Sequence, residues 1–65
     1  MTTTYLMHKT NQWVGVADLP DWVNFDEQPP RSFEVWWHNG GVLSMCSTKV
    51  VVPITKEVYD IMKGV

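Results

Sequence analysis

The sequence predicts a small α+β fold: a twisted antiparallel sheet of two hairpins and a short fifth strand, which could curl into a partial barrel, with one C-terminal helix. Three observations support this prediction. Apolar and polar residues alternate over short stretches, turn-forming residues separate these stretches, and the last twelve residues change to a helical spacing. Each element follows from its own residues.

The first hairpin is expected from Thr3–His8 and Trp13–Val16, which are rich in threonine, aromatic and β-branched residues. The polar segment between them is typical of a turn. Loops of two or four residues give the same register, with Tyr5 opposite Val16. One face then carries the apolar set that we expect to form the core, while Leu6 and Trp13 lie on the other face. The expected core set is Tyr5, Met7, Val14 and Val16.

The connector that follows is expected to contribute to the core. Asp18 precedes a Leu-Pro pair and could cap a short helical turn from Leu19 to about Phe25. Trp22 and Phe25, three residues apart, would lie on one side of this turn and close over the sheet. The two prolines at positions 29 and 30 then require an extended segment.

The second hairpin contains adjacent tryptophans, which cannot both enter one core if the segment is a strand. A three-residue loop, Asn39–Gly41, separates apolar from polar residues best, whereas a two-residue loop mixes them. We therefore expect Trp37 to pair with Leu43 and to face inward, with Trp36 outside. The inner face would hold Phe33, Val35, Trp37, Leu43 and Met45; the outer face would hold Ser32, Glu34, Trp36, Ser44, Cys46 and Thr48.

The C-terminal third predicts a short strand and a helix. Val50–Val52 forms the strand after a bulge or turn, and Pro53 ends it. The helix is expected from about Lys56 to Lys63, with Thr55 as its N-cap and Gly64 at its C-terminus. An apolar stripe of the helix is expected to pack on the sheet; it comprises Ile54, Val58, Ile61, Met62 and Val65.

Length and composition predict one domain, residues 1–65, near the lower size limit for a self-sufficient core. Domains this small usually depend on disulfides, a metal or a partner subunit. Cys46 is the sole cysteine, which rules out an internal disulfide and fits a reducing compartment. The chain has neither the long apolar run of a membrane span nor the pattern of a secretory signal. We therefore expect a soluble, cytoplasmic protein with no membrane partner.

Charge gives a weaker indication of partners. The net charge is −2, which is too small to steer the protein strongly toward nucleic acid or a basic partner. Four acids fall in a stretch that contains no base: Asp18, Asp21, Asp26 and Glu27. A solvated loop is the simplest interpretation of this stretch, and contact with a basic partner surface is the alternative.

No residue pattern indicates catalysis, a metal or a cofactor. His8, His38 and Cys46 lack the close spacing of structural zinc sites. A Cys-His nucleophile pair would also need an orienting group and a closed cleft. The glycines after His38 lack the lysine and hydroxyl residues of a phosphate loop. We therefore expect a protein that is not an enzyme.

Trp36 is the residue that best indicates a binding surface, because tryptophan is enriched at interface hot spots. His38 and Glu34 share its expected face, and Trp13 and Leu6 of the first hairpin could extend the patch. Three interpretations of Trp36 remain open. The C-terminal helix or the connector could cover it as core, a second copy could cover it in a dimer, or it could bind a different molecule.

Three functions follow from this surface. The first is a small regulatory protein that binds a larger protein partner, such as an inhibitor or accessory factor encoded by a virus or mobile element. The second is a single-stranded nucleic-acid-binding module, although Lys9, Arg31 and Lys49 are few for this role. The third is a structural subunit, most simply a homodimer, because a small sheet leaves open edges.

Overall fold

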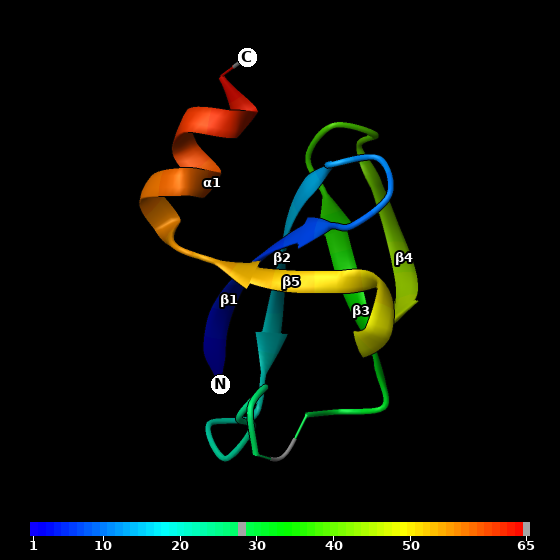
Figure 1. Cartoon of the computed structure of the whole chain (residues 1–65), viewed down its shortest axis with the longest axis vertical. Helices are drawn as coiled ribbons and strands as arrows, with labels where there is room; N and C mark the ends of the chain where they lie inside the picture. The colour runs from blue at the N-terminus through cyan, green and yellow to red at the C-terminus, as the bar shows by residue number, and fades with distance from the viewer. Residues whose placement is uncertain (28, 65) are drawn as a thin grey trace.

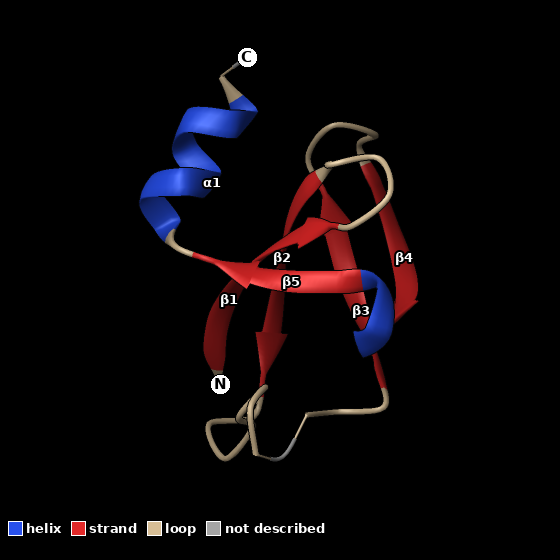
Figure 2. Cartoon of the chain, in the orientation of Figure 1, coloured by secondary structure: helices blue, strands red, loops and turns tan. Residues whose placement is uncertain are grey.

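Two hairpins and a returning fifth strand form one antiparallel sheet in the computed structural model, which describes residues 1–27 and 29–64 (Figures 1 and 2). The sheet order is β4-β3-β2-β1-β5. The predicted α+β class is therefore confirmed. The elements are β1 (Thr2–His8), β2 (Val14–Leu19), β3 (Ser32–Trp37), β4 (Val42–Ser47), the single 3-10 turn η1 (Thr48–Val50), β5 (Val51–Ile54) and α1 (Lys56–Lys63).

The sheet is strongly curled but open, with β4 and β5 as its edges. In Figure 1, β5 runs crosswise to β3 and β4, and η1 makes the turn between β4 and β5. Side chains from β1, β2, β3 and β5 therefore meet on one face of the sheet, which we call the inner face. The buried cluster on this face consists of Leu6, Ala17, Leu19, Phe33, Val35, Trp37 and Val51.

The first hairpin has the predicted register, with Tyr5 opposite Val16, but its core face is the opposite of the one predicted. Leu6 is fully buried, whereas Tyr5 and Val16 are only half-buried. Val14 is the member of the predicted set that is buried, although it is not part of the core cluster. The reason for the reversed core face is the length of β2, which continues to Leu19 and places Ala17 and Leu19 in the core. Alternation over this longer strand outweighs the apolar residues on the other face.

The connector does not form the predicted helical turn. β2 continues through the start of that segment, because Leu19 pairs with Thr2 and its side chain is buried. Trp22 is left 68% exposed, so the expectation that it covers the sheet is wrong. Phe25 does contribute, because its ring lies edge-on to Phe33 at a centroid distance of 5.9 Å and packs against the core cluster.

The second hairpin differs from its predicted register by one residue. Trp37 pairs with Val42, and the loop has four residues, closed by a hydrogen bond from the Gly41 N–H to the Trp37 carbonyl (2.9 Å). Contacts outside the hairpin fix this longer loop. The Asn39 side-chain oxygen accepts a hydrogen bond from the Val14 N–H at 2.8 Å, and Gly41 has φ +59°.

The register shift changes which residues of β4 face the core. Leu43 and Met45, predicted to lie inside beside Trp37, are instead 58% and 66% exposed. Cys46, which pairs with Phe33, is half-buried against the core cluster. The outer face of the second hairpin is therefore more apolar than the sequence analysis predicted.

The C-terminal elements begin and end close to the predicted positions. The turn after β4 is the 3-10 turn η1, and β5 continues past Pro53, which an edge strand tolerates. The side chain of Thr55 accepts a hydrogen bond from the Val58 N–H at 3.1 Å, which caps α1 as predicted. Among the described residues, no helix has the length and apolar character needed to cross a membrane.

The face that α1 buries is different from the predicted stripe. Tyr59 is its buried residue, with its ring centroid 5.0 Å from that of Tyr5. Val58 and Ile61 are exposed, and Met62 is half-buried. Val65 lies outside the described residues. An aromatic contact, which did not belong to the aliphatic stripe, thus attaches the helix to the sheet.

Candidate binding surface

The two adjacent tryptophans of β3 point to opposite faces of the sheet, as predicted. Trp37 is 3% exposed in the core cluster, whereas Trp36 is 43% exposed. This difference follows directly from the alternation of side chains along a strand and does not depend on the hairpin register. Trp36 is therefore on the outer face of the sheet.

A row of apolar cross-strand partners runs across the outer face. Each member pairs with the next through the sheet registers, and the row includes one residue from every strand. Cross-strand partners on one face have closely spaced Cβ atoms and therefore form a continuous surface. In sheet order, the row is Leu43, Trp36, Val16, Tyr5 and Ile54.

The helix covers only one end of this row. Tyr59 contacts Tyr5 with its ring tilted by 46°, and its ring centroid is 6.5 Å from that of His38. At the other end, Trp36 and Leu43 remain exposed. Met45 lies two residues beyond Leu43 on the same face and is also exposed. We call Trp36, Leu43 and Met45 the outer patch.

A cleft opens beside the outer patch because β2 and β3 diverge. The two strands pair only at Gly15 with Trp37 and at Val16 with Trp36. Beyond this point β2 stays paired with β1 and β3 stays paired with β4. The resulting cavity has a volume of about 250 Å³ and is lined by Val16, Ala17, Asp18, Phe33, Glu34, Trp36 and Leu43.

Two carboxylates stand on the two sides of this cleft. Asp18 and Glu34 each lie two residues from the Val16–Trp36 pair, in the direction in which the strands diverge. They therefore share the outer face with Trp36. The Thr3 hydroxyl donates a hydrogen bond to Asp18 at 3.0 Å. Within residues 1–27 and 29–64, neither carboxylate forms an ion pair.

The structure brings together some of the predicted site residues and separates others. Trp36 and Glu34 both line the cleft. Leu6 is in the core, so its predicted position on an exposed patch is wrong. Trp13 is half-buried against the β3–β4 loop, where a Cβ on Gly40 would lie 2.5 Å from its ring.

His38 continues the β2–β3 register beyond Trp37 and lies at the end of the outer face that α1 covers, so it does not line the cleft. Its N–H donates to the Val14 carbonyl at 2.9 Å, and its ring faces Tyr59. The residues missed by sequence analysis are Leu43, Met45, Val16 and Asp18. Leu43 and Met45 would have been found with the correct register of the second hairpin.

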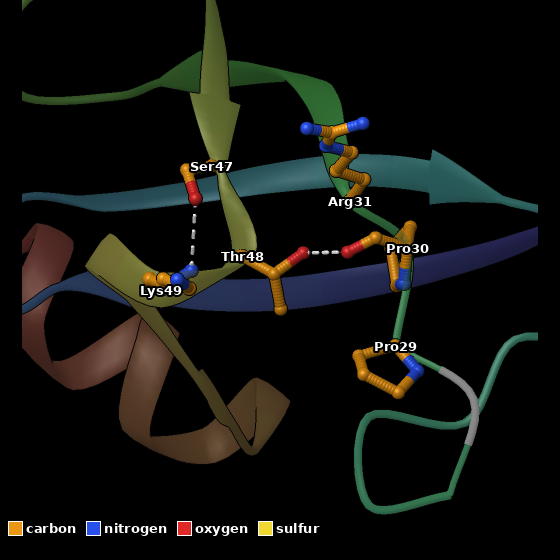
Figure 3. Close-up of a pocket in the computed structure, with 6 residues that line it drawn as sticks. All are labelled: Pro29, Pro30, Arg31, Ser47, Thr48 and Lys49. Atoms are coloured by element: carbon orange, nitrogen blue, oxygen red, sulfur yellow. Dashed lines mark hydrogen bonds between the residues drawn. The ribbon is translucent and has the colours of Figure 1, made fainter.

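A second cavity, of about 400 Å³, lies where η1 meets the start of β3 (Figure 3). Its hydroxyl groups are already engaged within the chain. Figure 3 shows the Thr48 hydroxyl directed at the Pro30 carbonyl, and the Ser47 hydroxyl accepts from the Lys49 N–H at 3.2 Å. The Thr48–Pro30 contact joins the turn after β4 to the connector, and the Ser47–Lys49 contact caps η1.

The basic residues around this second cavity form a separate surface. Arg31 and Lys49 line it, and the N–H of Lys9 donates to the carbonyl of Val50, the neighbour of Lys49. Among the described aromatic residues, none lines this cavity. Trp36 thus lines the cleft between β2 and β3, whereas Arg31 and Lys49 line this second cavity.

The chemistry of the remaining polar groups is limited. Within residues 1–27 and 29–64, no three histidine, cysteine, aspartate or glutamate side chains are placed to hold a metal ion. His8 Nδ1 accepts a hydrogen bond from the Thr10 N–H at 3.1 Å, and Cys46 lies 3.9 Å from the Ser44 carbonyl. Comparison with protein-family models, curated proteins and solved structures gave no match.

Proposed function

We propose that this protein is a non-catalytic interaction module that binds a larger protein partner through the outer patch. The observation that carries the proposal is the exposure of Trp36, Leu43 and Met45 on one continuous face beside a cleft. The size of the chain suits a small accessory factor or inhibitor of the kind that viruses and mobile elements encode. A cytoplasmic location is part of the proposal, supported by the single cysteine.

The composition of the outer patch supports binding. Tryptophan and methionine are enriched in protein interfaces, where the indole buries a large rigid surface and methionine adapts to its neighbour. An apolar patch that stays in water is unfavourable unless a partner covers it for part of the time. A small chain with a thin core would gain folding stability by burying the apolar side chains of the outer patch. Their exposure therefore supports a role in binding a partner.

The edge strand beside the patch supports the same role. β4 is an edge of the sheet, and its six residues contain no charged residue and no proline. Proteins usually protect exposed edges with lysine, proline or a covering loop, because an unprotected edge can pair with another chain. A partner strand could therefore extend the sheet at β4 while its side chains cover Leu43 and Met45.

A comparative capture experiment tests the proposal. Wild-type protein and the variants Trp36→Ala and Trp22→Ala are immobilised, and proteins retained from a cell extract are compared by quantitative mass spectrometry. Trp22 is the matched control, because its side chain is 68% exposed but lies outside the outer patch. We expect a protein that wild type and Trp22→Ala retain equally and that Trp36→Ala loses. Equal retention by all three proteins would show that the outer patch does not bind the captured protein.

Self-association is the second candidate, and the unprotected edge at β4 is the observation that favours it. Two copies could pair their β4 strands about a twofold axis and form a continuous sheet. Sedimentation equilibrium over a wide range of concentrations tests this arrangement. A dimer that Met45→Lys converts to a monomer would support it, and a monomer at the highest concentration would exclude it.

Binding to single-stranded nucleic acid is less well supported. A binding groove for single strands combines stacking aromatics with a basic track, whereas in this chain Trp36 and the basic residues Arg31 and Lys49 line different cavities. The exposed indole is instead next to Asp18 and Glu34, which would repel phosphates. We expect no retention of a labelled oligonucleotide in a filter-binding titration at low salt, where the phosphate contribution is strongest.

A further inference from the structure

The cleft beside Trp36 has the size and charge of a site for one side chain of a partner. Small-molecule sites are typically about 300–1,000 Å³, whereas this cavity is about 250 Å³. Its walls are the indole of Trp36 and the side chains of Val16 and Leu43, and its acidic groups are Asp18 and Glu34. A long side chain with an apolar stem and a positive end would match both parts.

The two carboxylates of the cleft have no cation partner among the described residues: no base lines the cleft, and neither carboxylate forms an ion pair. Asp18 and Glu34 lie at facing positions of β2 and β3, where the strands have diverged and leave the cleft between them. A positive group in the cleft would be attracted by both carboxylates.

The indole determines which cation fits best. An arginine guanidinium is planar, stacks on an aromatic face and donates hydrogen bonds to carboxylates in a fixed fork. A lysine ammonium also interacts with indole and carboxylate, but as a compact and strongly hydrated charge. We propose that the partner inserts an arginine side chain into the cleft between β2 and β3, with its guanidinium stacked on Trp36 between Asp18 and Glu34. This inference rests on the proposed function of the outer patch.

Capped tripeptides are suitable probes, because they carry the side chain without the rest of a partner. The protein is titrated with Ac-Ala-Arg-Ala-NH2 and followed by two-dimensional NMR of its backbone and indole N–H groups. Citrulline and lysine versions of the peptide are titrated in parallel. Citrulline has nearly the shape of arginine but no charge, so it isolates the contribution of the cation.

We expect saturable chemical-shift changes confined to the cleft residues, with the citrulline peptide binding about three- to ten-fold more weakly than the arginine peptide. The lysine peptide should fall between them. Glu34→Gln and Asp18→Asn should each weaken arginine binding by about three-fold or more. Glu57→Gln removes the same charge from α1, away from the cleft, and should bind like wild type.

Three results would overturn the inference: equal binding of the arginine and citrulline peptides, equal effects of Glu34→Gln and Glu57→Gln, or shift changes centred on another part of the chain. The capture experiment with Trp36→Ala and Trp22→Ala separates this failure from failure of the proposed function. If capture depends on Trp36 while the arginine peptide does not bind, partner binding by the outer patch is supported and only the arginine site is ruled out.

Discussion

Trp36 and Leu43 are cross-strand partners on β3 and β4, and on the outer face of the sheet they are 43% and 58% exposed. They continue a row of apolar residues whose other end lies under α1, where Tyr59 contacts Tyr5. The helix packs mainly on β1 and β2, and Leu43 of β4 remains exposed. One half of an apolar face is thus covered within the chain, and the other half is open to a partner.

The two tryptophans of β3 should differ in their effect on stability. Trp37→Ala removes a buried indole from the core and should lower the free energy of unfolding by about 3–5 kcal/mol, which approaches the whole stability of a domain this small. Trp36→Ala should lower it by less, about 1–2 kcal/mol, because the indole is already 43% exposed. Urea unfolding followed by circular dichroism measures both values. Similar losses for the two variants would mean that Trp36 is a core residue.

Gly15 should tolerate no side chain, because it pairs with Trp37 and the indole packs on it. A Cβ at this position would lie 2.5 Å from the Trp36 carbonyl oxygen and 2.8 Å from the Trp37 ring. We expect Gly15→Ala to lower the free energy of unfolding by about 1–3 kcal/mol. Gly64→Ala is the control, because its Cβ would meet only atoms at 3.6 Å or beyond. An unchanged stability of Gly15→Ala would contradict the close packing of Trp37.

The attachment of α1 should depend on Tyr59. An isolated helix of this length does not persist in water, so loss of its contact with Tyr5 should also reduce its helical content. Tyr59→Ala should therefore lose most of the helical signal in far-UV circular dichroism. Ile61→Ala, which changes an exposed side chain, should alter stability by less than about 0.5 kcal/mol. If Ile61→Ala were the more damaging change, the aliphatic stripe would be the docking face after all.

The helix should also loosen at low pH through Asp60. A hydrogen bond from Lys56 at 2.9 Å and an ion pair with Lys63 at 3.3 Å hold the pKa of Asp60 below its usual value. Because the folded-state pKa is the lower one, this contribution is present above the unfolded value of about 3.9 and is lost as the pH falls through the folded value.

An acid titration of the helical signal measures this effect. Wild type should lose part of the helical signal below about pH 4. Asp60→Asn has no carboxylate at this position, so its helical signal should not show this acid-induced loss. The hydrogen bond with Asp60 raises the pKa of Lys56, so the same interaction should weaken again as the pH rises through the raised value. Identical acid titrations of wild type and Asp60→Asn would show that these exposed pairs do not support the helix.

Local signals in the sequence predicted several elements correctly. Thr55 and Gly64 set the ends of α1 through short-range contacts, and alternation alone placed Trp36 and Trp37 on opposite faces. The register of the first hairpin was also predictable, because turns of two or four residues give the same pairing of Tyr5 with Val16. These features depend on residues within a few positions of one another.

Features set by distant residues were not predictable in this way. The loop of the second hairpin is held by Asn39 and Val14, which are 25 residues apart. The register of this hairpin places Leu43 on the outer face and so enlarges the outer patch. The core face of the first hairpin likewise depends on Leu19, whose place in β2 is fixed by pairing with Thr2.

The proposed binding role requires Trp36 to be exposed in the folded chain, and solvent paramagnetic relaxation measures that exposure directly. A neutral gadolinium chelate is added to dilute wild-type protein, and the relaxation of the ring protons of each tryptophan is recorded by NMR. We expect strong relaxation at Trp36 and at the exposed Trp22, and weak relaxation at Trp37. Trp36 protons protected as well as those of Trp37 in a monomeric sample would contradict the account.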